Sequence, residues 1–167
     1  MTTLHTIRCF DYVNHPYARV RDVLAANAAE AFRSATQAAA SRASSVASQL
    51  RVDIAGIELG TDVDIAVREI EERPGGSTSG PRTCLRLEWQ ASKRPELFPV
   101  MRADLAIYPL TPSETQLDFL GHYEPPLGVL GDAIDSILGH RVAEVSVHRF
   151  VTDVAAYLRA TIDEPSA

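Results

Sequence analysis

Hydrophobic and polar residues alternate with a period of two along much of the middle of the chain. This period places successive side chains on opposite faces of a β-strand. Four stretches show it clearly: residues 61–73, 83–91, 100–110 and 115–123. A shorter candidate strand, residues 51–57, precedes them. Because hairpin-like connections join these stretches, the pattern predicts an antiparallel meander with one apolar face and one polar face.

Residues 4–12 form a first candidate strand, and two helical patterns follow it. The first helix is expected to begin at Asn14, a good N-cap residue, with Pro16 in its first turn. Asn27 and Glu30 resemble a capping box, which predicts that a second helix starts there. This second helix is rich in Ala and Ser, so it offers little apolar area for burial.

The last amphipathic element is a long helix that starts near Leu130, after a hinge containing Pro125 and Pro126. Its first half carries one apolar stripe: Leu130, Ile134, Ile137, Leu138 and Val145. A second stripe, turned by more than ~120°, follows: Val147, Phe150, Val151, Val154 and Leu158. Either the helix bends near Gly139 or its halves contact different partners. We expect the first half to look into a cavity and the second to close the core.

Together these elements predict an α+β domain in which helices cover the apolar face of the sheet. The chain has 167 residues, of which 46% are apolar and 23% are charged, and these values are typical of a globular protein. We expect a single domain over residues 1–163 with a short tail at 164–167.

The charge balance argues against a nucleic-acid partner. Sixteen Lys and Arg residues face 22 Asp and Glu residues, which gives a net charge of −6, and no basic cluster occurs. The chain also lacks a signal-peptide pattern and an apolar stretch of the ~18 residues that a membrane span needs. These features predict a cytoplasmic protein without a membrane span.

Motifs for metal, phosphate or nucleophilic chemistry are missing from the sequence. The five histidines form no HExxH, and neither a GK[ST] nor a GxSxG motif occurs, so no metal or cofactor is expected. Cys9 and Cys84 are interpreted as reduced, buried thiols, with a disulfide or metal pair as the alternative.

Two groups of polar residues could serve acid–base or binding chemistry at the edge of a cavity. They are His122, Tyr123 and Glu124 at the end of the last strand, and Arg141, Glu144 and His148 on one helix face. Arg141 could hold an anionic or carbonyl group with its forked donors. The alternative is that these side chains face solvent, apart from Tyr123, which would pack beside the prolines.

Two segments carry a resemblance to a known superfamily. They are "DYVNHPYARVRDVL", between the first strand and the first helix, and the strand–"PPLG"–helix junction near residues 123–128. The order of elements resembles the START-like (SRPBCC, Bet v 1-like, polyketide cyclase/dehydrase-like) superfamily over nearly the whole chain, and looks most like small actinobacterial members. The resemblance implies a helix-grip fold, in which a curved antiparallel sheet wraps around a long C-terminal helix, with two N-terminal helices after the first strand.

The same resemblance implies a hydrophobic cavity between the sheet and the long helix, but fold alone does not settle function. The expected lining is Leu87, Trp89, Met101, Leu105, Leu117, Phe119, Leu130, Ile134, Ile137 and Arg141, with a possible polar rim of His122, Tyr123, Glu144 and His148. The first hypothesis is a binding or carrier protein for a hydrophobic or amphipathic molecule such as a lipid, polyketide or aromatic metabolite. The alternatives are a polyketide cyclase or dehydratase-type enzyme and a non-catalytic interaction module. A monomer and a homodimer are both compatible with the sequence.

Overall fold

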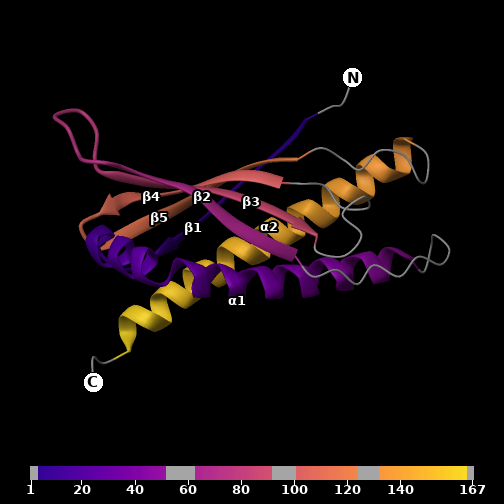
Figure 1. The fold of residues 1–167 in the computed structure, drawn as a ribbon, viewed down its shortest axis with the longest axis horizontal. Coiled ribbons are helices and arrows are strands. Elements are labelled where there is room, and N and C mark those ends of the chain that lie inside the picture. Colours follow the sequence, from indigo (N-terminus) through magenta and orange to yellow (C-terminus); the bar gives the residue numbers. More distant parts are fainter. Residues whose placement is uncertain (1–3, 52–62, 92–100, 124–131, 165–167) are drawn as a thin grey trace.

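The computed structural model describes residues 4–51, 63–91, 101–123 and 132–164. Strand β1 comes first, helix α1 follows it, four further strands come next, and helix α2 ends the domain (Figure 1). The bounds are β1 His5–Val13, α1 Tyr17–Arg51, β2 Val63–Arg73, β3 Arg82–Ala91, β4 Met101–Thr111, β5 Glu114–Tyr123 and α2 Asp132–Asp163. No helix among these residues is long and apolar enough to cross a membrane.

The five described strands form one antiparallel sheet in the order β1-β5-β4-β3-β2. Strands β2 to β5 follow one another as hairpins, as the alternating pattern predicts, whereas β1 pairs with β5, the last strand of the meander. Both helices lie against the same face of the sheet, and α2 crosses beneath the strands (Figure 1). The candidate strand at 51–57 is wrong at Arg51, where α1 ends, and residues 52–57 lie outside the described residues.

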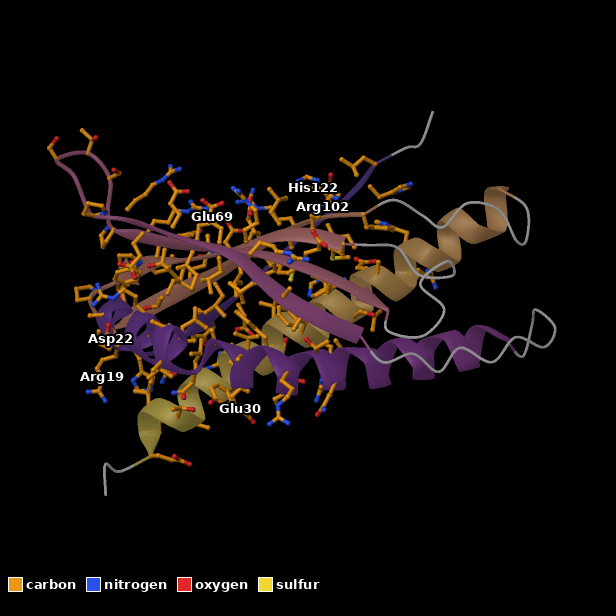
Figure 2. All side chains as sticks on the ribbon, in the orientation of Figure 1. Arg19, Asp22, Glu30, Glu69, Arg102 and His122 are labelled. Atoms are coloured by element: carbon orange, nitrogen blue, oxygen red, sulfur yellow. The ribbon has the colours of Figure 1, made fainter. Side chains whose placement is uncertain are left out.

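The two faces of the sheet differ in chemistry, as the period of two predicts. The inner face, toward the helices, carries buried apolar side chains: Ile7, Cys9, Leu85, Leu87, Met101, Ala103, Leu105, Ile107, Leu117 and Phe119. Most charged strand residues point the other way, and Figure 2 shows Glu69, Arg102 and His122 on that outer side. A β-bulge between Val67 and Glu69 shifts the alternation in β2, so that Ile70 pairs with Leu85.

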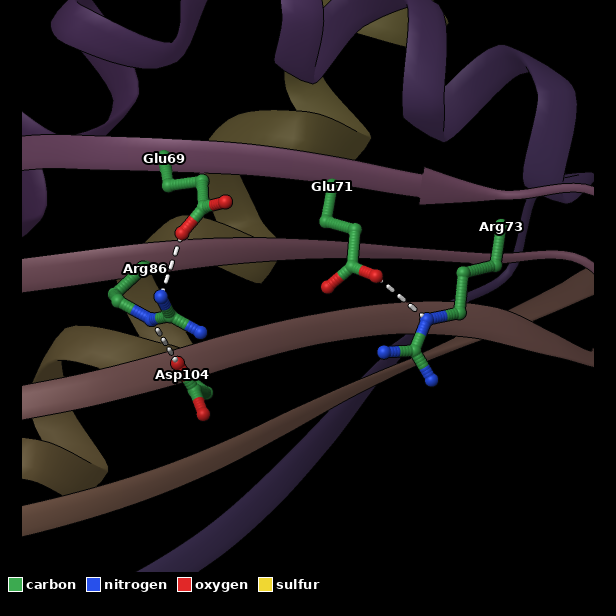
Figure 3. Close-up of polar contacts among 5 residues, drawn as sticks. All are labelled: Glu69, Glu71, Arg73, Arg86 and Asp104. Carbon is green, nitrogen blue, oxygen red and sulfur yellow. Dashed lines mark hydrogen bonds and ion pairs between the residues drawn. The ribbon is translucent and has the colours of Figure 1, made fainter.

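Arginine and carboxylate side chains pair across neighbouring strands on the outer face (Figure 3). Arg86 of β3 donates to Glu69 of β2 at 2.5 Å and lies 3.6 Å from Asp104 of β4. Within β2, Arg73 donates to Glu71 at 2.8 Å. Each exposed pair of this kind contributes little stability. The main effect of these ion pairs is therefore to neutralise charge across a solvated surface.

Helix α1 consists of two helical segments that meet at Asn27. The backbone of Asn27 has φ −128° and ψ 22°, which is not helical. The restart that the sequence predicts at this residue is therefore confirmed. The expected capping role of Glu30 is not what the structure shows, because its carboxylate accepts hydrogen bonds from Arg33 at 2.6 and 2.7 Å.

Four aromatic side chains from the sheet and both helices form the centre of the core. Phe150 of α2 stacks on Phe32 of α1 with ring centroids 5.9 Å apart. It also meets Trp89 edge-on at 5.2 Å and Phe119 at 5.9 Å. Edge-to-face and stacked pairs at such distances add to the free energy gained from burial. The second helical stripe predicted from the sequence is confirmed, because its five members are all buried: Val147, Phe150, Val151, Val154 and Leu158.

Arg159 ties the C-terminal part of α2 to strand β1. Its guanidinium donates to Asp11 Oδ1 at 3.2 Å and to the backbone carbonyl of Tyr12, and lies 5.7 Å from the centre of the Tyr12 ring. Both hydrogen bonds come from one nitrogen, Nη2, while the planar guanidinium lies over the Tyr12 ring. Arg159 therefore holds the end of the long helix against the edge strand.

Replacing Arg159 with lysine is expected to lower the free energy of unfolding by about 1–2 kcal/mol, since lysine keeps the charge but lacks the planar guanidinium that covers the Tyr12 ring while it donates to β1. Urea unfolding monitored by circular dichroism measures the change. The matched control is Arg149→Lys, because the exposed Arg149 pairs with Asp153 at 2.9 Å on the same helix. Equal effects of the two substitutions would contradict a special role for Arg159.

Candidate functional site

One transverse row of inner-face residues crosses all five strands near the end of the sheet where β3 stops and β4 starts. The register pairs His5 with Tyr123, Tyr123 with Met101, Met101 with Trp89, and Trp89 with Ile65. Side chains at directly paired positions lie on the same face of a sheet. This terminal row therefore places two polar rings at the β1 and β5 side and apolar groups across the rest.

A hydrogen bond joins the terminal row to helix α2. The phenol oxygen of Tyr123 lies 3.0 Å from Nδ1 of His140. The ring of His5 stacks on Tyr123 at 5.4 Å and lies 6.2 Å from the ring of His140. Tyr123 is buried, at 1% exposure, whereas His140 reaches solvent. The sheet and the helix thus bring a phenol and two imidazoles together at the edge of an apolar interior.

The electrostatics of this polar cluster (His5, Tyr123, His140 and Glu144) keep the phenol protonated. Burial raises the pKa of Tyr123, and the negative charge of Glu144 raises this pKa further. Desolvation disfavours phenolate, and a nearby carboxylate repels it. Tyr123 therefore acts as a neutral hydroxyl group that can donate one hydrogen bond and accept others.

On the side of the terminal row that faces the middle of the sheet, the interior is tightly filled. Phe119 stacks on Trp89 with ring centroids 5.8 Å apart. A methyl group built on Gly121 would lie 2.8 Å from Phe119 Cε1 and 3.1 Å from the sulfur of Met101. Glycine at this buried strand position therefore makes room for the Phe119 ring. At the opposite end of the sheet, the hydroxyl of Tyr17 lies 2.6 Å from that of Thr83, which joins α1 to β3.

The residues predicted to line a cavity divide into three groups. Leu87, Leu105, Leu117 and Phe119 are fully buried in the core, Met101 is 3% exposed, and Trp89 is half-buried. Leu130 lies outside the described residues. Ile134 and Ile137 belong to α2, but their side chains are outside the described set. The sheet side of the expected lining is thus an apolar inner face.

The polar residues predicted at the cavity do not act as one group. Tyr123 lies on the inner face, but His122 lies on the outer face, where its Nδ1 is 3.2 Å from the Thr6 hydroxyl oxygen. Arg141, Glu144 and His148 are exposed on α2. Of these three, Glu144 acts on the interior through its effect on the pKa of Tyr123.

Sequence reasoning missed His5 and His140 as partners of Tyr123. The alternation of β1 could have placed His5 on the inner face, since His5 is two residues before the buried Ile7 and four before the buried Cys9. His140 is four residues before Glu144, so both belong to one helix face. The missing information was the packing of α2 across the end of β5, which joins residues 17 positions apart in the chain.

The two cysteines are free, as the sequence predicts. Cys9 is buried, and desolvation raises the pKa of its thiol to about 12. Cys84 is half-buried, and burial raises its pKa as well. Neither thiol is therefore activated as a nucleophile. Within the described part of the chain, no group of three or more His, Cys, Asp or Glu side chains could hold a metal ion.

Comparison with solved structures identifies the fold. An aromatase/cyclase from Streptomyces sp. R1128 matches with a TM-score of 0.52 and 12% identity, over 97% of this chain and 98% of that chain. Norcoclaurine synthase from Thalictrum flavum matches with a TM-score of 0.47 and 8% identity, over 99% and 91% of the two chains. The protein named Ara h 8.0201 matches with a TM-score of 0.48 and 7% identity, over 95% and 99%. No family model and no curated protein matches the sequence.

The chain has the helix-grip fold: an antiparallel sheet, a helical segment after the first strand and a long C-terminal helix. The fold that the sequence resemblance implies is thereby confirmed by the match to the aromatase/cyclase. Because one fold carries many activities, the function has to be argued from the site.

Proposed function

We propose that the protein binds a hydrophobic or amphipathic small molecule between the sheet and the first half of α2. The observation that carries this proposal is the Tyr123–His140 hydrogen bond, which sets a polar pair at the edge of an apolar inner face. Ligand sites of this kind combine mostly apolar walls with a few convergent polar groups that fix orientation. The cytoplasmic location and the small-molecule partner expected from the sequence are part of this proposal.

The packing of the core favours a ligand site at the end of the domain that contains the terminal row. Toward the other end, Phe32, Phe119 and Phe150 fill the space between the helices and the sheet. The half-buried Trp89 lies in the terminal row itself, with one flank against Phe119 and Phe150. A ligand would therefore lie beside Trp89 and Met101, with its polar end toward Tyr123.

Protection of Trp89 tests the proposal, because the chain contains a single tryptophan. We expect a saturating apolar compound, decanoate or prodan, to lower the quenching of Trp89 fluorescence by acrylamide, a water-soluble contact quencher. The matched control carries Trp89→Phe together with Phe10→Trp, which moves the only indole to the exposed outer face. In that variant the same compounds should leave quenching unchanged.

Native mass spectrometry of protein purified from its own host supplies the second half of this test. A bound small molecule that is released on denaturation would agree with a carrier. The proposal fails if no mass co-purifies and no apolar compound protects Trp89.

The alternative is an enzyme of the cyclase or dehydratase kind, and the same polar pair favours it. A phenol hydrogen-bonded to an imidazole can pass a proton to or from a bound molecule. On this hypothesis Tyr123→Phe abolishes turnover of a candidate substrate while leaving its binding nearly unchanged. A carrier would show no turnover in either form of the protein.

A further inference from the structure

We propose that the free edge of strand β1 pairs with the same edge of a second copy of this chain, so that two sheets join into one across a two-fold axis. In the described sheet, β1 and β2 are the edge strands. An edge strand presents unpaired N–H and C=O groups, to which another strand can bind. Most homodimers have this two-fold symmetry, in which each subunit offers the same surface. The proposed dimer does not depend on the ligand.

The two edges differ in their protection against pairing. Strand β2 carries the bulge between Val67 and Glu69, and five of its six residues at 68–73 are charged. Bulges and charged side chains are features that keep edge strands from pairing. Strand β1 pairs with β5 over nine residues without a shift of register, and it contains neither proline nor lysine. The edge that is open to pairing is therefore that of β1.

The charges of β1 do not oppose pairing, because contacts within the chain neutralise them. Arg8 donates to the two carboxylate oxygens of Asp118 at 3.1 and 2.9 Å. Arg159 of α2 donates to Asp11 at 3.2 Å. Beside these ion pairs, the Phe10 ring is 59% exposed. Two copies of this edge can therefore approach without repulsion between like charges, and apolar surface is partly covered when they meet.

Hydrogen bonds at Tyr12 show which main-chain groups of β1 face the free edge. Its N–H donates to the Asp11 carboxylate at 2.7 Å, and its C=O accepts from Arg159 of α2, so β5 uses neither group. Pro109 of β4 agrees with this: it has no N–H for Thr115, its partner in β5, so Thr115 turns its main-chain groups toward residue 13 of β1. Along an antiparallel pair, bonded and non-bonded residues alternate. The even-numbered residues of β1 therefore face the free edge.

This alternation selects one register for the dimer. A two-fold axis at Arg8 would set Arg8 opposite itself, and like charges in that position are destabilising. An axis at Phe10 would set Arg8 opposite the partner's Tyr12, whose N–H and C=O are already bonded. An axis at Cys9 sets Arg8 opposite the partner's Phe10 twice, and each such pair can exchange both main-chain bonds. We therefore assign the axis to Cys9.

The side chains match in the Cys9 register as well. Within one chain, the Arg8 guanidinium lies 5.6 Å from the centre of the Phe10 ring. Across the axis, each Phe10 ring would also meet the partner's Arg8, which is an attractive cation–π arrangement. Pairing takes place in the plane of the sheet, so these side chains stay on the outer face of the dimer.

The mass of the protein in solution tests the dimer. We expect light scattering during gel filtration to give twice the chain mass of 18.2 kDa, falling toward the monomer on dilution. Phe10→Pro removes an N–H that points to the free edge and leaves the ladder with β5 intact, so this variant should be a folded monomer. Circular dichroism checks its fold. The matched control Phe10→Val keeps the N–H and should still form the dimer.

A pair of charge variants tests the same edge without proline. Position 10 faces the partner's Arg8 twice in each dimer, so Phe10→Lys adds repulsion there and Phe10→Glu adds attraction. We expect the dissociation constant of Phe10→Lys to be at least about 10-fold higher than that of Phe10→Glu. Sedimentation equilibrium measures both constants. Because Phe10 is exposed, both variants should fold alike.

A disulfide test measures the register. Thr6 and the partner's Tyr12 are directly opposite when the axis is at Cys9. Paired residues have Cα atoms about 5.5 Å apart, a separation that a disulfide can span. Thr6→Cys and Tyr12→Cys are each made in a background without the native thiols, Cys9→Ala with Cys84→Ser. A mild oxidant should cross-link these two proteins when they are mixed and should not cross-link either one alone.

The outcomes decide between this edge and other surfaces. A protein that stays monomeric at all concentrations overturns the inference. So does a dimer whose affinity is the same in folded Phe10→Pro and in both charge variants, since it must use another surface. Cross-linking of either single variant alone overturns the assigned register. Loss of the dimer in Phe10→Pro, the expected order of the charge variants and cross-linking only in the mixture support the inference.

Discussion

Replacing Phe150 with alanine is expected to lower the free energy of unfolding by about 3–5 kcal/mol. Phe150 is fully buried and contacts Phe32, Trp89 and Phe119, so its ring joins α2 to α1 and to the sheet. Removing the ring loses its burial and leaves a cavity that the surrounding rings cannot fill without breaking their own contacts. Urea unfolding followed by Trp89 fluorescence and by circular dichroism measures the loss.

Phe10→Ala is the matched control for this substitution. The side chain is the same, but Phe10 lies on the outer face at 59% exposure, where the guanidinium of Arg8 lies 5.6 Å from the centre of its ring. We expect a change of less than about 1 kcal/mol. Similar losses for both variants would mean that the four-ring core is not the centre of stability.

Gly121→Val is expected to cost about 2–3 kcal/mol through overpacking. The new Cβ at position 121 would lie 2.8 Å from Phe119 Cε1. The Phe119 ring is buried and contacts Trp89 and Phe150, so it cannot move aside. The sulfur of Met101, at 3.1 Å, belongs to a flexible side chain and can give way more easily. The strand would have to bend, or Phe119 would have to leave its position.

The effect of Gly121→Val reaches the site as well as the fold, because Met101 lies in the terminal row. We therefore expect weaker protection of Trp89 by prodan in this variant even at temperatures where it is folded. Gly80→Val is the control, since the nearest described atom to a Cβ there is Pro109 Cγ at 3.7 Å, an ordinary contact. A Gly121→Val protein as stable as Gly80→Val would show that the inner face is loosely packed.

The sequence predicted most of the fold because its signals are local. Alternation located β2 to β5 to within about two residues, and the N-cap character of Asn27 located the break in α1. The bulge at Val67 and Glu69 was not predicted, because a bulge depends on the partner strand. The strand expected at 51–57 was wrong at Arg51, because α1 extends through that residue.

The site was less predictable than the fold. Alternation correctly divided the apolar side chains of β3 to β5 from the polar ones, so Leu87 and Phe119 fall on the inner face. His122 and Tyr123 were grouped as one polar rim because both are polar and end the same strand, yet adjacent residues in a strand point to opposite faces. His122 contacts Thr6 on the outer face, and Tyr123 contacts His140 of α2 on the inner face.

By itself, the sequence determined which face of each strand is apolar, where α1 breaks and that the last helix is long, because these follow from period and capping. Only the tertiary structure decided that His5, Tyr123 and His140 meet. That meeting depends on β1 pairing with β5 and on α2 crossing the end of the sheet. The contacts of His5 with Tyr123 and His140 join residues more than 100 positions apart, and no local pattern encodes the distance between them.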